Sequence, residues 1–248
     1  MPAAIEIKNV SVRYHEKVVL RDATTTVPQG AICGLVGMNG AGKSTLFKAI
    51  MNTVPLLSGS VRLEGKTVKA AQKKGIVAYV PQAEMIDWNF PVSVEDVVMM
   101  GRYGSMNILR QPGKEDRNEV AKALVRVHLS DFATRQIGQL SGGQRKRVFV
   151  ARALAQGASI LLLDEPFAGV DAKTEASLVE LLRELQKQGV TVLIAAHDLA
   201  TIGTYCDHII LLKQTIVASG PTKKVFTKEN IAETYDSVFG KKGMPWSI

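Results

Sequence analysis

The 248-residue chain has little cysteine and few aromatic side chains: Cys33 and Cys206 are its two cysteines, and Phe, Trp and Tyr make up 6% of it. Two cysteines are too few for a disulfide framework, so we expect buried free thiols and a reducing compartment. No apolar run approaches the ~20 residues that a membrane-spanning helix needs. Glu6 and Lys8 stand where a secretory signal would be apolar, so we expect neither export nor a spanning helix.

The composition is otherwise that of a folded globular protein. Hydrophobic residues make up 46% of the chain and charged residues 22%, which excludes disordered and collagen-like classes. The length suits one large domain or two small ones. With 31 Lys and Arg against 23 Asp and Glu, the net charge is +8. Nucleic acid, an anionic membrane surface and a phosphate-rich ligand all suit this charge, which does not choose between them.

Strand and helix patterns alternate along much of the chain. Residues 5–20 alternate apolar and polar side chains, which predicts a β-rich lobe. The apolar run 31–36 leads through a glycine-rich loop into a helical pattern over 43–51. Later, the apolar runs 160–163 and 190–196 flank an amphipathic helix over 172–188. Buried strands that alternate with helices predict an α/β fold with a parallel sheet covered on both faces.

Helical spacing replaces the strand pattern between these two halves. Val120, Ala123, Leu124 and Val127 have this spacing, and we interpret residues 86–157 as a helical subdomain inserted into the α/β core. We expect a single domain over 1–248. Its core would comprise about 1–85 and 158–225, and a C-terminal helix and tail would occupy about 226–248.

A phosphate-binding pattern lies between the first buried strand and its helix. Residues 37–44 read Gly-Met-Asn-Gly-Ala-Gly-Lys-Ser, which matches G-x-x-x-x-G-K-[ST] in the strand–loop–helix context that this pattern requires. Loop N–H groups and the helix N-terminus would surround a polyphosphate, Lys43 would reach its β- and γ-phosphates, and Ser44 would ligate Mg²⁺. A chance glycine-rich turn would lack that context. The candidate binding residues are Gly37, Met38, Asn39, Gly40, Ala41, Gly42, Lys43, Ser44 and Thr45.

Two carboxylates follow the buried strand at 160–163. Asp164 and Glu165 stand at its C-terminal end, where open parallel sheets bind ligands. Asp164 is a candidate Mg²⁺ ligand, and Glu165 a candidate acceptor of a proton from an attacking water. Taken alone the pair suits a solvated strand end, but beside the phosphate loop a catalytic role is favoured.

A second glycine-flanked helix start lies at residues 140–144, Leu-Ser-Gly-Gly-Gln. Ser141 and Gln144 have the spacing of a capping box, and Gly142 and Gly143 lie between them. Such a helix N-terminus can bind an anion, and it can serve a nucleotide held by another copy of the chain. A plain N-cap is the structural alternative. We interpret the basic residues that follow as a solvated face: Arg145, Lys146, Arg147 and Arg152.

These motifs together, with His197-Asp198 after the last apolar run, resemble the ATP-binding-cassette (ABC) family over nearly the whole chain. The resemblance implies a RecA-like P-loop core, ATP and Mg²⁺ as ligands, and ATP hydrolysis. It implies that Tyr14 stacks on adenine, Gln82 approaches the metal and the water, and His197 is a switch residue. Without it, Tyr14 is an ordinary strand aromatic and His197 a capped strand end. Asp171 would belong to a loop that faces the partner, although residues 168–170 read Ala-Gly-Val rather than Ser-Ala-Leu.

The resemblance thus defines three groups of residues. The catalytic group is Glu165, His197, Gln82 and Lys43. The metal group is Ser44, Gln82 and Asp164. The nucleotide-binding group is the 37–45 loop with Tyr14, Ser141, Gly142, Gly143, Gln144 and Asp171.

Within that family, residues 80–82, 87–91, 100–104 and 165–171 resemble the ATPase subunits of bacterial manganese, iron and zinc importers, above all the manganese/iron type. This implies a homodimer that encloses two ATP molecules and a peripheral position at the cytoplasmic face of the inner membrane, on an integral-membrane permease. A periplasmic or extracellular metal-binding protein would be an indirect partner. Trp88 and Phe90 would dock on the permease, or pack in the core of the helical subdomain.

Three other functions fit the sequence less well. A zinc importer differs from the leading hypothesis only in its cargo. A soluble ABC ATPase that acts on nucleic acid usually has a coiled-coil insertion or two cassettes in one chain, so no nucleic-acid partner is expected. A P-loop kinase would share Lys43 and Ser44 but gives no reason for the second helix start at Ser141.

Overall fold

Two sheets organise the chain in the computed structural model, which describes residues 2–82, 90–106, 109–196 and 199–235. The first sheet is antiparallel and has the order β2-β1-β4-β5. Its strands are β1 (Ala3–Tyr14), β2 (Lys17–Pro28), β4 (Ser58–Leu63) and β5 (Lys66–Thr67). Ile5 on β1 pairs with Val27 on β2 and with Leu63 on β4, and all three side chains are buried. The β-rich N-terminal lobe predicted from the alternation of side chains is confirmed.

The second sheet has six strands in the order β10-β9-β3-β8-β7-β6. They are β3 (Ile32–Val36), β6 (Val77–Val80), β7 (Ile160–Asp164), β8 (Thr191–Ala196), β9 (His208–Lys213) and β10 (Thr215–Pro221). All neighbours pair in parallel except β10, which runs antiparallel to β9 at the edge. The wholly apolar strands therefore form the parallel sheet that was predicted, and the α/β class is confirmed.

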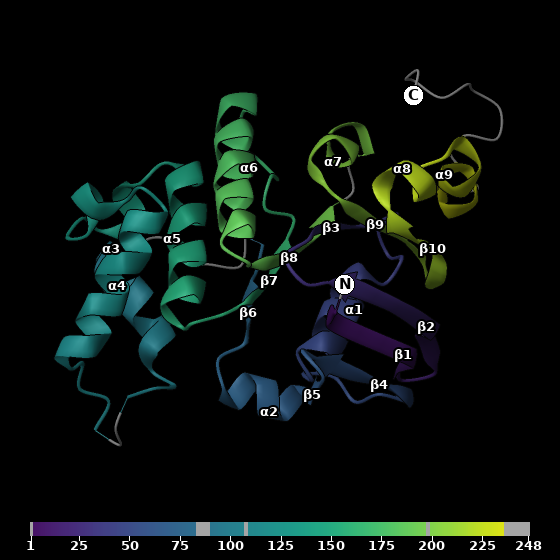
Figure 1. The fold of residues 1–248 in the computed structure, drawn as a ribbon, viewed down its shortest axis with the longest axis horizontal. Helices are drawn as coiled ribbons and strands as arrows, with labels where there is room; N and C mark the ends of the chain where they lie inside the picture. Colours follow the sequence, from purple (N-terminus) through teal and green to yellow (C-terminus); the bar gives the residue numbers. More distant parts are fainter. Residues whose placement is uncertain (1, 83–89, 107–108, 197–198, 236–248) are drawn as a thin grey trace.

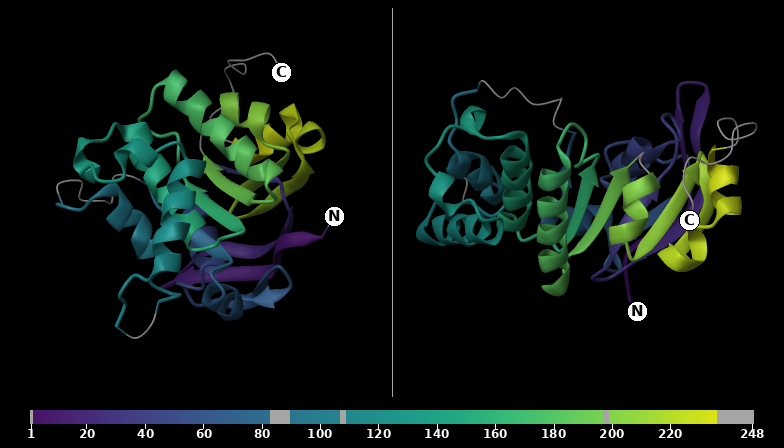
Figure 2. Two further views of the ribbon diagram at one scale, coloured as in Figure 1. Left: turned by 60° about the vertical axis from the view of Figure 1, so that its left-hand side comes forward. Right: turned by 90° about the horizontal axis from the view of Figure 1, so that it is seen from above.

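Helices cover one face of this sheet, and α1 with the antiparallel sheet covers the other. Leu161 and Leu163 share a core with α5 (Gly142–Ala155), α6 (Ala172–Lys187) and α7 (Leu199–Tyr205). Ile160 and Leu162 point the opposite way, as successive strand residues must, into a core with α1 (Lys43–Ile50) and α2 (Val68–Lys73). Figure 2 shows the sheet between these two layers.

The helical region lies to one side of the sheets (Figure 1). It contains α3 (Val94–Met99), a 3₁₀ turn (Met100–Arg102), α4 (Lys114–Arg126) and α5. Arg102 anchors the turn to α4 through an ion pair with Asp116 at 3.0 Å. Beyond β10, α8 (Thr222–Val225) and α9 (Lys228–Tyr235) complete the described chain. A helical insertion is present, and its exact division from the core at 86 and 157 stays a prediction.

Cys33 and Cys206 are free, buried thiols, as expected. Burial raises the pKa of both, so that both remain protonated at neutral pH. Among the helices that the structure describes, none is long and apolar enough to cross a membrane.

Candidate functional site

The loop between β3 and α1 forms the centre of the site. Gly42 caps α1 with a φ of 106°, a conformation that favours glycine. A Cβ at Gly37 would lie 2.2 Å from the Leu212 carbonyl oxygen of β9, so a side chain there would displace the loop. The ammonium of Lys43 donates to the carbonyl oxygens of Gly37 at 2.7 Å and Met38 at 3.2 Å. The predicted strand, loop and helix are therefore present in the predicted order.

A cavity of about 300 Å³ opens over this loop. Its lining includes Asn39, Gly40, Lys43, Ser44 and Thr45 of the predicted phosphate-binding residues, and Glu165 from the end of β7. The structure thus brings together two sequence motifs that are more than a hundred residues apart. The parallel pairing of β3, β8 and β7 places them at the same edge of the sheet.

Asp164 lies within hydrogen-bonding reach of the same loop. Burial raises the pKa of this carboxyl, while hydrogen bonds from Tyr79 and Ser44 and the charge of Lys43 act in the opposite direction. The Tyr79 hydroxyl donates to Asp164 Oδ2 at 2.9 Å. Burial also lowers the pKa of the Lys43 ammonium, opposed by Glu165 and Asp164. The charges of Lys43, Asp164 and Glu165 therefore interact with one another.

Gln82 follows β6 and reaches the end of β7. Its side-chain amide donates to Glu165 Oε2 at 3.3 Å. Glu165 itself has a φ of 47°, and its N–H donates to the Ala195 carbonyl oxygen on β8 at 3.0 Å. This left-handed residue turns the chain sharply off the strand, so that the Glu165 side chain leaves the sheet beside the phosphate loop.

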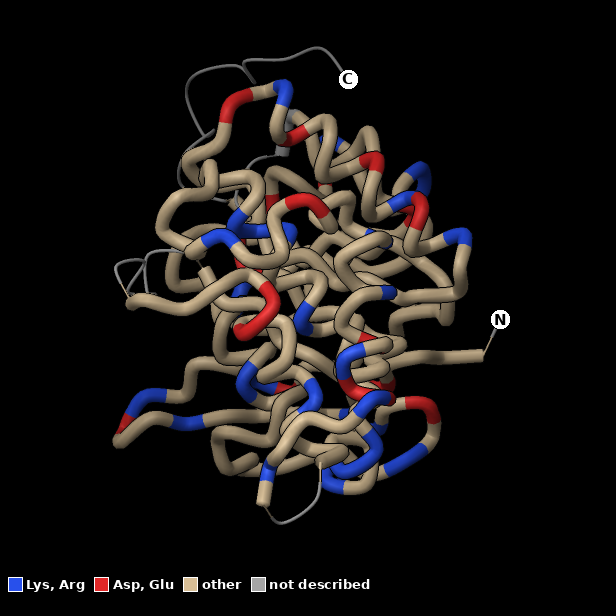
Figure 3. The backbone as a smooth tube through the Cα atoms, turned by 90° about the vertical axis from the view of Figure 1, so that its left-hand side faces the viewer, with Lys and Arg blue, Asp and Glu red and all other residues tan. Residues whose placement is uncertain are grey.

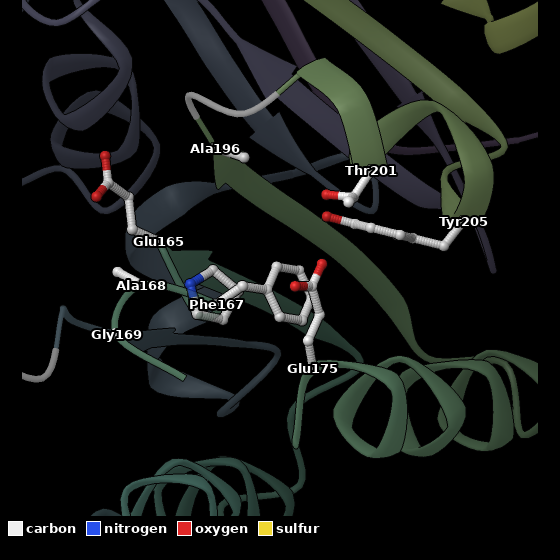
Figure 4. Close-up of a pocket in the computed structure, with 9 residues that line it drawn as sticks. Glu165, Phe167, Ala168, Gly169, Glu175, Ala196, Thr201 and Tyr205 are labelled. Atoms are coloured by element: carbon white, nitrogen blue, oxygen red, sulfur yellow. The ribbon is translucent and has the colours of Figure 1, made fainter. Parts of the chain in front are cut away.

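A second cavity, of about 280 Å³, lies on the other side of Glu165. Phe167 and Tyr205 line it and form an edge-to-face ring pair with centroids 5.3 Å apart. Figure 4 shows the Glu165 carboxylate pointing away from Thr201 and Tyr205. The Glu165 carboxylate therefore points away from this part of the second cavity (Figure 4).

Residues 141–144 form a separate site at the start of α5. Ser141 and Gln144 make the predicted capping box, in which the Ser141 hydroxyl accepts from the Gln144 N–H and the Gln144 side chain accepts from the Ser141 N–H. A cavity of about 270 Å³ adjoins them and Gly143. Within the described chain, no residue lines both this cavity and the one over the phosphate loop. In the part of the chain that the structure describes, the two motifs therefore line separate cavities.

Asp171 caps helix α6. Its carboxylate accepts from the N–H and the hydroxyl of Thr174, both at 2.9 Å, and these bonds lower its pKa. Tyr14 stands at the end of β1 with 37% of its surface exposed, and the described lining of the phosphate-loop cavity does not include it. His197 and Trp88 lie outside the described residues, so their predicted places are not tested.

The basic residues after Gln144 do not form the solvated face that we predicted. Arg145 donates to the Gly138 carbonyl oxygen at 2.6 Å, and Lys146 to that of Ala168 at 2.6 Å. Arg147 donates to Val127 O at 3.1 Å and to the carbonyl and hydroxyl oxygens of Ser177. The prediction was wrong for these three residues, which are half-buried, because long cationic side chains can donate to carbonyl groups of neighbouring segments. Elsewhere on this side of the molecule the two signs of charge are interspersed (Figure 3).

A comparison with known proteins identifies a family and relatives that match most of this chain. A model of the ABC transporter family matches residues 20–168. The manganese transport system ATP-binding protein MntA of Synechocystis is 56% identical over 93% of this chain and 89% of its own length. The chelated iron transport system membrane protein YfeB of Yersinia pestis is 52% identical over 94% of this chain and 79% of its own length. The zinc transport system ATP-binding protein TroB of Treponema pallidum is 44% identical over 94% and 86%.

Solved structures of ABC transporters and their ATP-binding cassettes also match the chain. A metal-chelate type ABC transporter in an inward-facing conformation matches with a TM-score of 0.83 and 27% identity, over 94% of this chain and 89% of that one. An ATP-binding cassette of an ABC transporter in its ADP conformation matches with a TM-score of 0.83 and 26% identity, over 96% of this chain and 100% of that one.

Proposed function

The chain belongs to the ABC transporter family, as an ATPase of that family, and we propose that it powers the import of manganese or iron. The observation that carries the proposal is the group formed by Lys43, Asp164, Glu165 and Gln82 around the phosphate loop. The cargo follows from relatives named for manganese and iron at 56% and 52% identity, whereas the zinc relative is 44% identical.

The loop over residues 37–45 holds the phosphates of ATP. Its N–H groups and the positive end of α1 stabilise the anionic oxygens. The Lys43 ammonium, which donates to two carbonyl oxygens of the loop in this structure, binds the β- and γ-phosphates instead. Tyr14, exposed at the end of β1, stacks on the base.

The donors beside Lys43 fit Mg²⁺, which prefers hard oxygen ligands. The Ser44 hydroxyl and the Asp164 carboxylate already interact, and Gln82 adds a side-chain carbonyl nearby. When bound, the ion neutralises charge on the phosphates. These residues would hold it, and Tyr79 keeps the Asp164 carboxylate in place.

Glu165 is the group placed to activate water. Its carboxylate lines the phosphate-loop cavity and can accept the proton of a water that attacks the γ-phosphate. Gln82, in contact with Glu165, links the base to the segment that leads to the helical subdomain. We assign His197 as a further residue that orients the water or the γ-phosphate.

Two copies of the chain complete the site. Residues 141–144 and Asp171 of one copy face the nucleotide on the phosphate loop of the other, and two ATP molecules lie in the dimer. The two motifs of one copy line separate cavities, which supports an arrangement in which each nucleotide contacts the loop of one copy and residues 141–144 of the other.

The dimer acts at the cytoplasmic face of the membrane on an integral-membrane permease, which receives metal from an extracytoplasmic binding protein. The segment after Gln82 supplies the docking surface, with Trp88 and Phe90 as anchors. Phe90 is 59% exposed, and Tyr103 in the same region is 41% exposed. Exposed aromatic side chains of this kind often dominate protein interfaces.

Metal uptake tests the proposal. Cells that depend on this chain should accumulate radioactive manganese with the wild type and with Glu180→Gln, an exposed control on α6, but not with Glu165→Gln. Excess iron should compete with the label. Competition by zinc without competition by iron would assign the zinc alternative, and full uptake with Glu165→Gln would contradict the role of the chain as the motor.

A further inference from the structure

Lys146 makes a contact between two parts of the chain that the sequence keeps apart. It lies in the first turns of α5, and its ammonium donates to the Ala168 carbonyl oxygen at 2.6 Å. Burial lowers the pKa of this ammonium, and its side chain also borders a small cavity beside Pro81 and Glu165. Taking a cation out of water is costly unless it gains strong hydrogen bonds, so this contact fixes the position of both partners.

A second contact joins the same two regions a few residues away. The Thr174 hydroxyl donates to Asp171 Oδ2, and the Thr174 methyl group faces Gly143 so closely that a Cβ on Gly143 would lie 2.2 Å from it. The loop over residues 168–171 is therefore held at both ends against the start of α5: by Lys146 at Ala168 and by Thr174 at Asp171.

We infer that Lys146 is a positioning residue for ATP hydrolysis, which holds the 168–171 loop and residues 141–144 as one rigid unit. The inference rests on the proposed dimer, in which both segments of one copy face the nucleotide of the other. The spacing between them then decides whether both reach the partner at once. Lys146 does not line the phosphate-loop cavity, so its loss should leave ATP binding to that loop intact.

Substitutions of Lys146 in the full-length chain test this. Lys146→Met keeps most of the apolar stem but loses the donor, whereas Lys146→Gln keeps an N–H donor. Lys122→Met, at an exposed site on α4, is the matched control. For Lys146→Met we expect kcat to fall about tenfold or more, with KM for ATP within about twofold, as for a contact that matters in the transition state alone. Lys146→Gln should recover most of kcat, and Lys122→Met should equal the wild type.

Hydrogen exchange provides a readout that does not depend on hydrolysis. The amides of residues 168–171 should exchange at least about tenfold faster in Lys146→Met, while those of the parallel sheet keep their wild-type protection. If these amides exchange alike in all variants, or if Lys146→Met hydrolyses ATP like the wild type, the inference is wrong. A wild type that hydrolyses no ATP would instead refute the proposed function, and the exchange comparison would still show whether Lys146 holds the 168–171 loop.

Discussion

At the scale of single residues, the account depends first on the cation of the phosphate loop. Lys43→Ala removes the ammonium that meets the phosphates, and the loss of a charge-assisted contact predicts ATP binding weaker by about tenfold to a hundredfold. Hydrolysis should fall with it. Equilibrium binding of a fluorescent ATP analogue measures the effect, with Lys48→Ala, exposed on the same helix, as the control. Unchanged binding by Lys43→Ala would refute the phosphate-loop assignment.

Glu165 should separate binding from chemistry. Glu165→Gln keeps the size and most hydrogen bonds of the side chain but cannot accept a proton. We therefore expect wild-type ATP affinity and hydrolysis slower by about a hundredfold or more. Phosphate release under single-turnover conditions measures the chemical step. Hydrolysis near the wild-type rate would show that another group is the base, and Glu180→Gln controls for the loss of a carboxylate.

At the scale of helices and strands, the cap of α6 should depend on pH. Hydrogen bonds from Thr174 lower the pKa of Asp171 below its usual 3.8. A folded-state pKa below the unfolded one means that the stability from this carboxylate is present above about pH 3.8 and is lost as the pH falls through the folded-state value. Asp171→Ala should therefore lower the melting temperature at neutral pH.

Melting curves from about pH 7 to about pH 3 test this cap. The difference between wild type and Asp171→Ala should narrow at the acid end, because the carboxyl loses its charge as the pH falls. A difference that stays constant over this range would mean that the charged carboxylate does not stabilise the cap.

The elements themselves could largely be predicted from the sequence. Strands such as 160–163 are apolar on both faces because both faces are covered, and the Ser141–Gln144 spacing gave the start of α5 because capping is local. The loop at 37–44 could be predicted because its residues are adjacent in the sequence. Interactions between residues that are close in the sequence determine these features, so the sequence pattern reveals them directly.

The contacts between elements could not be predicted in this way. The Tyr79 hydroxyl reaches Asp164 only because β6 pairs with β7, 85 residues further along the chain. Lys146 and Arg147 belong to a basic run that is typical of a solvated face, yet they bind carbonyl groups of distant segments. Such partners depend on the tertiary fold, and a run of like charges carries no sign of them.

At the scale of the whole molecule, the segment after Gln82 should govern attachment to the permease. A Trp88→Ala, Phe90→Ala double variant should hydrolyse ATP in isolation but fail to copurify with the permease, because the exposed Phe90 ring and its neighbour are the proposed anchors. Val125→Ala, 62% exposed on α4, is the control. Because Phe90 is exposed, a double variant that unfolds would assign Trp88 to the core, and one that still copurifies would place the docking surface elsewhere.

The assembly of two copies around ATP is the central claim, and light scattering during gel filtration of Glu165→Gln tests it most directly. With Mg-ATP, the variant should elute at about twice the 26.9 kDa of one chain, because bound ATP joins the phosphate loop of one copy to residues 141–144 of the other. Adding Ser141→Arg should return the mass to that of one chain, without loss of bound ATP. A Glu165→Gln protein that stays monomeric at saturating Mg-ATP would contradict the account.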